Sequence, residues 1–128
     1  MNIIDSSFWL EYFAGTKAGD IVSDIVENTR ELVVPAITLY EVFKKLLLER
    51  NEDDALLAVG HMKQGKVIDL TEELSLSAAK TSIKYKLPMA DSIIYATNLK
   101  YNCTLWTQDQ HFSGLNSVNY FEKIRDGE

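Results

Sequence analysis

The chain alternates short apolar runs with longer stretches of helical periodicity, and this alternation constrains the fold more than any other feature. Apolar runs predict strands at 1–4, 32–35, 66–70 and 103–106, with a weaker fifth at 117–121. Helical spacing lies between them, at 8–13, 20–30, 37–50, 55–64, 74–87 and 89–99. Strands separated by helices pair in parallel through right-handed crossovers. We therefore expect an α/β/α sandwich with a central, mainly parallel sheet of four to five strands.

The spacing also predicts the inward faces of two helices and the form of the tail. In 20–30 we expect Ile21, Ile25 and either Val22 or Val26 to face inward. Thr38 is a candidate cap of 37–50, and residues 125–128 are predicted to be a loose tail. The apolar arc of 37–50 consists of Leu39, Tyr40, Val42, Phe43, Leu46 and Leu47.

The length and composition fit one hydrophobic core, so we expect a single domain over residues 1–128. The chain has 128 residues, of which 46% are hydrophobic, and a core of that size needs no second domain. There is no long uncharged apolar run and no signal-peptide pattern at the N-terminus, which predicts a cytoplasmic protein without a membrane segment. The single cysteine, Cys103, lies in an apolar run and is predicted to be a buried strand residue.

The charge balance excludes one kind of nucleic-acid binding. Thirteen basic and nineteen acidic side chains give a formal net charge of −6, the wrong sign for a protein that binds nucleic acid through a broad basic surface. An acidic protein can still act on phosphates if its carboxylates are gathered around metal ions. It can equally bind a basic protein partner.

Two acids stand just beyond predicted strands. Asp5 follows the first strand and Asp109 follows the fourth, and in a parallel sheet these ends meet at one edge, where ligands bind. Each acid also has a local explanation. Asp5 or Ser6 can cap the following helix, and Asp109 can hydrogen-bond its own backbone in a polar loop.

Two further acids lie early on predicted helices and can lean over the same edge. Glu41 shares a polar arc with Lys44 and Lys45, so a solvent-facing position also explains it. Asp91 begins a helix whose apolar side chains point in nearly every direction, which predicts that Asp91 is buried. The helix dipole favours an acid there. However, no Lys or Arg lies within one turn, and an unpaired buried carboxylate costs several kcal/mol.

Four carboxylates brought together without basic partners repel one another and raise their own pKa values unless cations lie between them. Asp5, Glu41, Asp91 and Asp109 are the residues concerned. Mg²⁺ and Mn²⁺ prefer oxygen ligands, so either ion suits an all-carboxylate site.

The four acids lie in the segments 3–7, 38–42, 90–96 and 107–112, whose order and spacing span almost the whole chain. Together these segments resemble the PIN-domain ribonucleases, and in particular the VapC-type toxins of VapBC toxin–antitoxin pairs. The resemblance implies that the four acids bind Mg²⁺ or Mn²⁺, with Ser7 and Thr107 as neighbouring hydroxyls. Many relatives carry a further acid where this chain has His111, a departure that leaves the number of metal ions open.

The resemblance implies that a metal-activated water hydrolyses RNA phosphodiester bonds, as in the toxin of a type II toxin–antitoxin pair. It also implies a cognate antitoxin and a homodimer. Lys44 and Lys45 are weaker candidates for contacts with substrate phosphates, and a solvated face explains them as well. Two alternatives keep the fold, an RNA-processing nuclease outside a toxin system and a non-catalytic binding protein. A phosphoacceptor receiver domain is disfavoured because Asp5 lacks the paired acid that such a domain needs.

Overall fold

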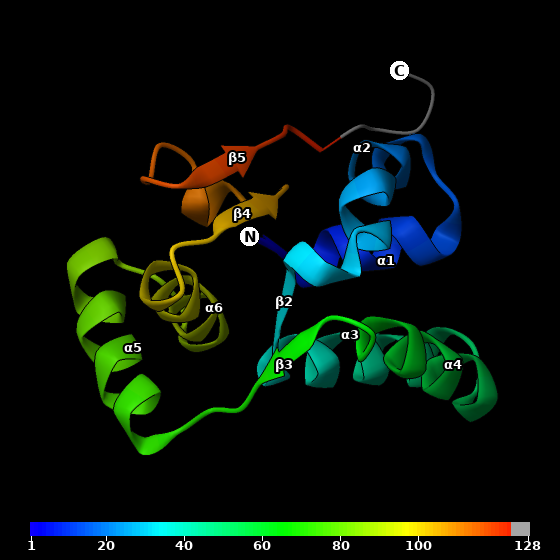
Figure 1. Cartoon of the computed structure of the whole chain (residues 1–128), viewed down its shortest axis with the longest axis horizontal. Helices are drawn as coiled ribbons and strands as arrows, with labels where there is room; N and C mark the ends of the chain where they lie inside the picture. Colours follow the sequence, from blue (N-terminus) through cyan, green and yellow to red (C-terminus); the bar gives the residue numbers. More distant parts are fainter. Residues whose placement is uncertain (124–128) are drawn as a thin grey trace.

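The computed structural model describes residues 1–123 and contains a five-stranded parallel sheet at its centre (Figure 1). The strand order is β3-β2-β1-β4-β5, and all four neighbouring pairs run parallel. The strands are β1 (Asn2–Ile4), β2 (Leu32–Pro35), β3 (Lys66–Ile68), β4 (Thr104–Thr107) and β5 (Val118–Tyr120). The expected α/β/α sandwich is therefore confirmed, including its weak fifth strand.

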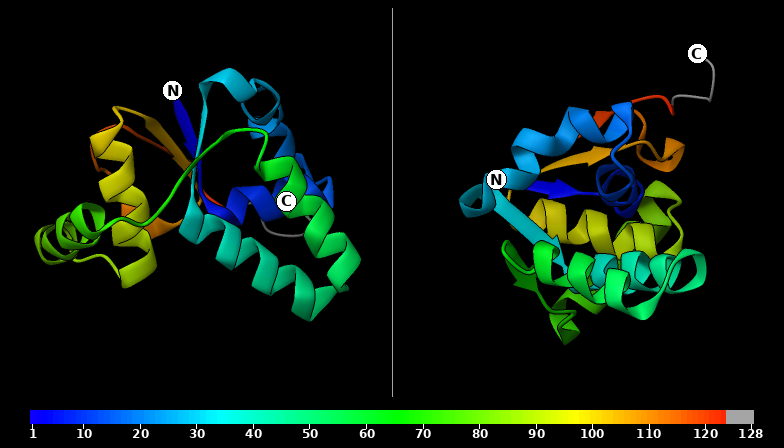
Figure 2. Two further views of the ribbon diagram at one scale, coloured as in Figure 1. Left: turned by 60° about the horizontal axis from the view of Figure 1, so that its bottom comes forward. Right: turned by 90° about the vertical axis from the view of Figure 1, so that its right-hand side faces the viewer.

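Helices cover both faces of the sheet, as Figure 2 shows. They are α1 (Ser6–Ala14), α2 (Lys17–Glu27), α3 (Ala36–Glu49), α4 (Glu52–Met62), α5 (Glu72–Tyr85) and α6 (Met89–Lys100), with short 3-10 helices η1 (Thr29–Glu31) and η2 (Gln110–Phe112). Successive strand residues point to opposite faces. Ile3 accordingly belongs to the core beneath α5 and α6, and Ile4 to the core beneath α1–α4. No helix within residues 1–123 is long and apolar enough to span a bilayer.

The inward face of α2 differs from the prediction. The helix begins at Lys17 rather than at residue 20, because the Thr16 hydroxyl caps it by accepting a hydrogen bond from the Gly19 N–H at 3.1 Å. Ile21, which the spacing placed inward, is exposed, whereas Val22 and Val26 are fully buried. The close approach of Gly19 to α1 turns that side of the helix inward.

The prediction for α3 is wrong in two respects. Thr38 does not cap this helix, which begins at Ala36 directly after Pro35. Instead Thr38 is fully buried, and its hydroxyl donates a hydrogen bond to the Pro35 carbonyl oxygen at 2.7 Å. Tyr40 and Leu47 were predicted to lie on the apolar arc but are exposed. The helix contacts the rest of the protein through a narrower stripe than its composition suggests.

The predicted helix at 74–87 is confirmed as α5, but the apolar spacing that predicts it does not mark its buried face. Leu76 and Ile83 are 64% and 83% exposed, whereas Leu74, Ala78 and Thr81 are buried. Both sets have helical spacing, so periodicity alone cannot choose between them. Packing against α6 selects the second set. The predicted loose tail at 125–128 lies outside the described residues.

Gly19 allows α1 and α2 to touch backbone to backbone, and we expect Gly19→Ala to lower the free energy of unfolding by about 1–3 kcal/mol. A Cβ at this position would lie 2.5 Å from the Glu11 carbonyl oxygen and 2.7 Å from the Tyr12 Cα. Neither backbone atom can move without shifting α1. Urea denaturation measures the effect.

Gly60→Ala is the matched control, because a Cβ at Gly60 in α4 meets nothing within 4 Å. Alanine is the better helix former, so this variant should be neutral or slightly stabilised. Equal stability of the two variants would show that α1 and α2 do not need the close contact.

Candidate metal centre

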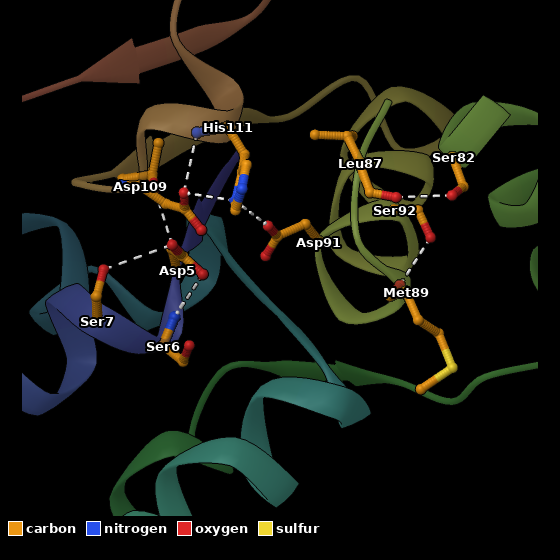
Figure 3. Close-up of polar contacts among 11 residues, drawn as sticks. Asp5, Ser6, Ser7, Ser82, Leu87, Met89, Asp91, Ser92, Asp109 and His111 are labelled. Atoms are coloured by element: carbon orange, nitrogen blue, oxygen red, sulfur yellow. Dashed lines mark hydrogen bonds and ion pairs between the residues drawn. The ribbon is translucent and has the colours of Figure 1, made fainter. Parts of the chain in front are cut away.

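Three predicted acids and one histidine point toward one another at the C-terminal edge of the sheet (Figure 3). Asp5 directly follows β1, Asp109 lies two residues after β4, and Asp91 comes from the first turn of α6. His111 lies in η2. The order of the strands, with β1 beside β4, brings Asp5 and the loop after β4 together.

Asp5 is both a helix cap and a member of this cluster. Its Oδ1 accepts a hydrogen bond from the Ser6 N–H at 2.8 Å, which caps α1. Its Oδ2 accepts one from the Thr107 hydroxyl at 2.7 Å and a longer one from the Ser7 hydroxyl at 3.4 Å. The side chain is buried, and this burial raises the pKa of Asp5 despite the hydrogen bonds from Thr107 and Ser6. Capping and membership of the cluster are therefore not alternatives.

Thr107 connects the two loops that carry Asp5 and Asp109. Its hydroxyl donates to Asp5 and accepts a hydrogen bond from the Asp109 N–H at 2.9 Å. Thr107 is fully buried. Both predicted supporting hydroxyls, those of Ser7 and Thr107, thus contact Asp5, and the contact from Thr107 is the shorter.

His111 lies between Asp91 and Asp109. Its Nδ1 is 3.0 Å from Asp91 Oδ2 and 2.9 Å from Asp109 Oδ1. Burial, together with the charges of Asp109 and Asp5, raises the pKa of Asp91 to about 7, although the charge of His111 lowers it. The pKa of His111 is raised by its hydrogen bond to Asp109 and by the charge of that residue.

Asp109 also bonds its own backbone, as the loop interpretation predicted. Its Oδ1 accepts a hydrogen bond from the His111 N–H at 2.9 Å and so caps η2. The same oxygen is the one nearest to the His111 ring. This local bond fixes the position of the carboxylate without removing it from the cluster.

Glu41 is not on a freely solvated face. It is half-buried, and its Oε1 is inaccessible to solvent and has no hydrogen-bond partner within residues 1–123. Burial and the charge of Asp5 raise the pKa of Glu41. A buried oxygen without a partner is rare and costs about 1–3 kcal/mol. Glu41 thus has an unsatisfied acceptor and lies close enough to Asp5 to feel its charge.

The two lysines do not pair with the cluster. Lys44 Nζ lies over the Tyr40 ring at 5.7 Å from its centroid, and Lys45 Nζ is 3.0 Å from Glu49 Oε1. Both lysines are exposed. Within residues 1–123 no Lys or Arg forms an ion pair with any of the four acids.

These features fit a divalent cation. Asp91 has a raised pKa because it is buried among other acids, and the buried Glu41 Oε1 has no hydrogen-bond partner. Within residues 1–123 His111 is the only basic side chain that pairs with any of the four acids. One ligand atom from each of Asp91, Asp109 and His111 lies within 4.8 Å of the others. Asp5 and Glu41 are outside this group of three. The charge of Asp5 nevertheless raises the pKa of Asp91 and that of Glu41.

A model of the PIN-domain family matches residues 3–117 of the chain. The protein belongs to the PIN-domain family. A comparison with curated proteins finds no significant match. The assignment to this family therefore rests on the family model and on similarity to solved structures.

Solved structures of several toxin–antitoxin proteins share the fold at low sequence identity. A toxin–antitoxin complex from Klebsiella pneumoniae matches with a TM-score of 0.80 at 20% identity, covering 96% of this chain and 100% of that one. Mycobacterium tuberculosis VapC20, a toxin that cleaves the sarcin–ricin loop, matches with a TM-score of 0.76 at 17% identity, covering 91% of this chain and 95% of that one. DNA-bound VapBC from Salmonella typhimurium matches with a TM-score of 0.73 at 13% identity, covering 94% of this chain and 96% of that one. The chain is thus a VapC-like PIN domain in its fold, as its motifs predicted.

Proposed function

We propose that this PIN domain is a metal-dependent endoribonuclease and the toxin of a type II toxin–antitoxin pair, acting in the cytoplasm. The observation that carries the proposal is the convergence of Asp5, Asp91 and Asp109 from separate elements, without a Lys or Arg partner among residues 1–123. The likeness to a toxin described as cleaving the sarcin–ricin loop supports RNA as the substrate.

The proposed roles follow from the contacts of each side chain. Mg²⁺ or Mn²⁺, when bound, lowers the pKa of the attacking water and stabilises the charge that develops on the phosphate. Asp91 and Asp109 hold the ion, and Thr107 fixes Asp5 beside them. Glu41 offers its unpartnered oxygen as a hydrogen-bond acceptor at the same edge. Lys44 and Lys45 stay the predicted candidates for contacts with substrate phosphates, although neither forms an ion pair with the four acids.

An RNA cleavage assay tests this function directly. We expect the purified protein to cut a structured RNA in the presence of Mn²⁺ or Mg²⁺ and to stop when EDTA is added. Single-stranded DNA of the same sequence should survive. An equal rate of cleavage in EDTA, or no cleavage with either ion, would contradict the proposal.

The same charges suggest how an antitoxin would inhibit the enzyme. We expect an Arg or Lys of the partner to enter the carboxylate cluster, because the net charge is −6 and none of its four acids pairs with a Lys or Arg among residues 1–123. The purified complex should therefore bind Mn²⁺ at least about 10-fold more weakly than the free protein in isothermal titration calorimetry. Equal affinities would rule out this mode of inhibition. The homodimer stays a prediction, which analytical ultracentrifugation measures.

A further inference from the structure

His111 is the one nitrogen donor within the cluster, and the four-acid pattern gives it no role. Its Nδ1 lies 2.9 Å and 3.0 Å from one oxygen each of Asp109 and Asp91. Adjacent ligands of an octahedral ion with bonds of about 2.1 Å lie about 3 Å apart. The nitrogen is therefore spaced from both carboxylates as neighbouring ligands of one ion would be.

The backbone holds His111 in this position. Asp109 caps the short helix η2 through the His111 N–H, and the next residue, Phe112, is fully buried. The Phe112 ring packs against Tyr95 of α6, with 6.2 Å between the ring centroids. The helix that carries Asp91 and the loop that carries His111 are thereby fixed against each other.

The imidazole turns toward the acids although it is not confined by burial. Its side chain is 54% exposed, whereas that of Asp91 is 13% exposed. Figure 3 shows the ring directed at both carboxylates. Part of the ring edge thus faces solvent, which leaves access for water or substrate on that side.

We propose that His111 Nδ1 is a direct ligand of the cation, together with Asp91 and Asp109, and that this nitrogen makes the site prefer Mn²⁺ to Mg²⁺. Mn²⁺ and Mg²⁺ both bind carboxylates, but Mn²⁺, as a transition-metal ion, also accepts an imidazole nitrogen among them, whereas Mg²⁺ keeps to oxygen ligands. The inference rests on the metal site of the proposed function and adds to it a ligand and an ion preference. It distinguishes this chain from relatives that carry an acid at this position.

Electron spin echo spectroscopy of bound Mn²⁺ tests the ligand without measuring activity. A coordinated imidazole gives a ¹⁴N modulation, and the chain contains only two histidines, His61 and His111. With untagged protein, the wild type and His61→Gln should both show the signal, and His111→Gln should lose it. Mn²⁺ bound to the wild type without a ¹⁴N signal would overturn the proposal.

Calorimetric titration tests the ion preference. His111→Gln should weaken Mn²⁺ binding about 10- to 100-fold and change Mg²⁺ binding less than about threefold. His111→Asp, which makes the ligand set all-carboxylate, should restore Mg²⁺ binding relative to Mn²⁺. Unchanged Mn²⁺ affinity in His111→Gln would count against the proposed ligand, provided that circular dichroism shows the variant folded.

The outcomes separate this inference from the proposed function. A ¹⁴N signal from a protein that cleaves no RNA would refute the nuclease proposal and leave the ligand assignment standing. Metal-dependent cleavage without a ¹⁴N signal would support the nuclease proposal and refute the assignment of His111 as a ligand. A wild-type protein that binds no Mn²⁺ would refute both.

Discussion

Asp91→Asn is expected to reduce RNA cleavage by roughly 10²-fold or more and, at the same time, to stabilise the metal-free protein at pH 8. Loss of the charge removes a proposed ligand of the cation, and a single electrostatic stabiliser of a transition state is worth about 10²- to 10³-fold. The gain in stability follows from the same charge, because burial and the neighbouring acids raise the pKa of Asp91 to about 7. Cleavage rates and thermal unfolding in EDTA measure the two effects.

Asp69→Asn is the matched control for this variant. Asp69 is an exposed acid just beyond β3 and belongs to no part of the cluster, so the substitution should leave cleavage and stability within error. If Asp91→Asn cut RNA at the wild-type rate, Asp91 would have no part in the chemistry.

Asp5 provides a useful contrast with Asp91. Asp5→Asn or Asp5→Ala should also abolish cleavage. However, Asp5 caps α1 and accepts a hydrogen bond from Thr107, and loss of a helix cap costs about 0.5–2 kcal/mol. We expect the Asp5 variants to stay folded. Unlike Asp91→Asn, they should not be more stable than the wild type.

The metal-free protein is expected to lose stability as the pH rises from 5 to 8. Burial and the charges of neighbouring acids raise the pKa of Asp91 to about 7 from its ordinary 3.8 and also raise the pKa values of Asp5 and Glu41. Between the unfolded and the folded pKa of each group, the native state holds more protons, so stability falls as the pH rises. The raised pKa of His111 changes stability in the same direction. The stabilisation from protonated His111 is lost as the pH rises from 6.5 through the pKa of His111 in the folded protein.

Urea denaturation at pH 5, 6, 7 and 8 in EDTA measures this dependence. Asp91→Asn should show a shallower decline, because the carboxyl group whose pKa is raised to about 7 is no longer present to titrate. At pH 8, Mn²⁺ at 100 times its dissociation constant should restore about 2.7 kcal/mol to the wild type. Stability that is flat or rises with pH in the metal-free wild type would show that the acids do not strain the folded state.

The sheet was predictable because its signals are local and simple. Apolar runs that end in polar residues mark buried strands, and the intervening helices force parallel pairing. The inward faces of α2 and α5 were not predictable to the same degree. Ile21 and Ile83 have helical spacing with other apolar residues, and only the packing of α1 and α6 decides that both are exposed.

The site was predictable where an acid follows a strand, as Asp5 and Asp109 do. Parallel neighbours end at one edge, so the topology of the sheet brings these two together. His111 was identified only as a departure from the family pattern. Its contact with Asp91 joins η2 to α6, twenty residues earlier in the chain, and depends on the packing between them. No local pattern encodes such a contact.

Anomalous diffraction from a crystal soaked in Mn²⁺ tests most directly whether these side chains hold a cation. We predict a peak at coordination distance, about 2.0–2.3 Å, from the oxygens of Asp91 and Asp109, with Asp5 beside it. A peak elsewhere on the protein, or none at this edge of the sheet with Mn²⁺ well above its measured dissociation constant, would contradict the account.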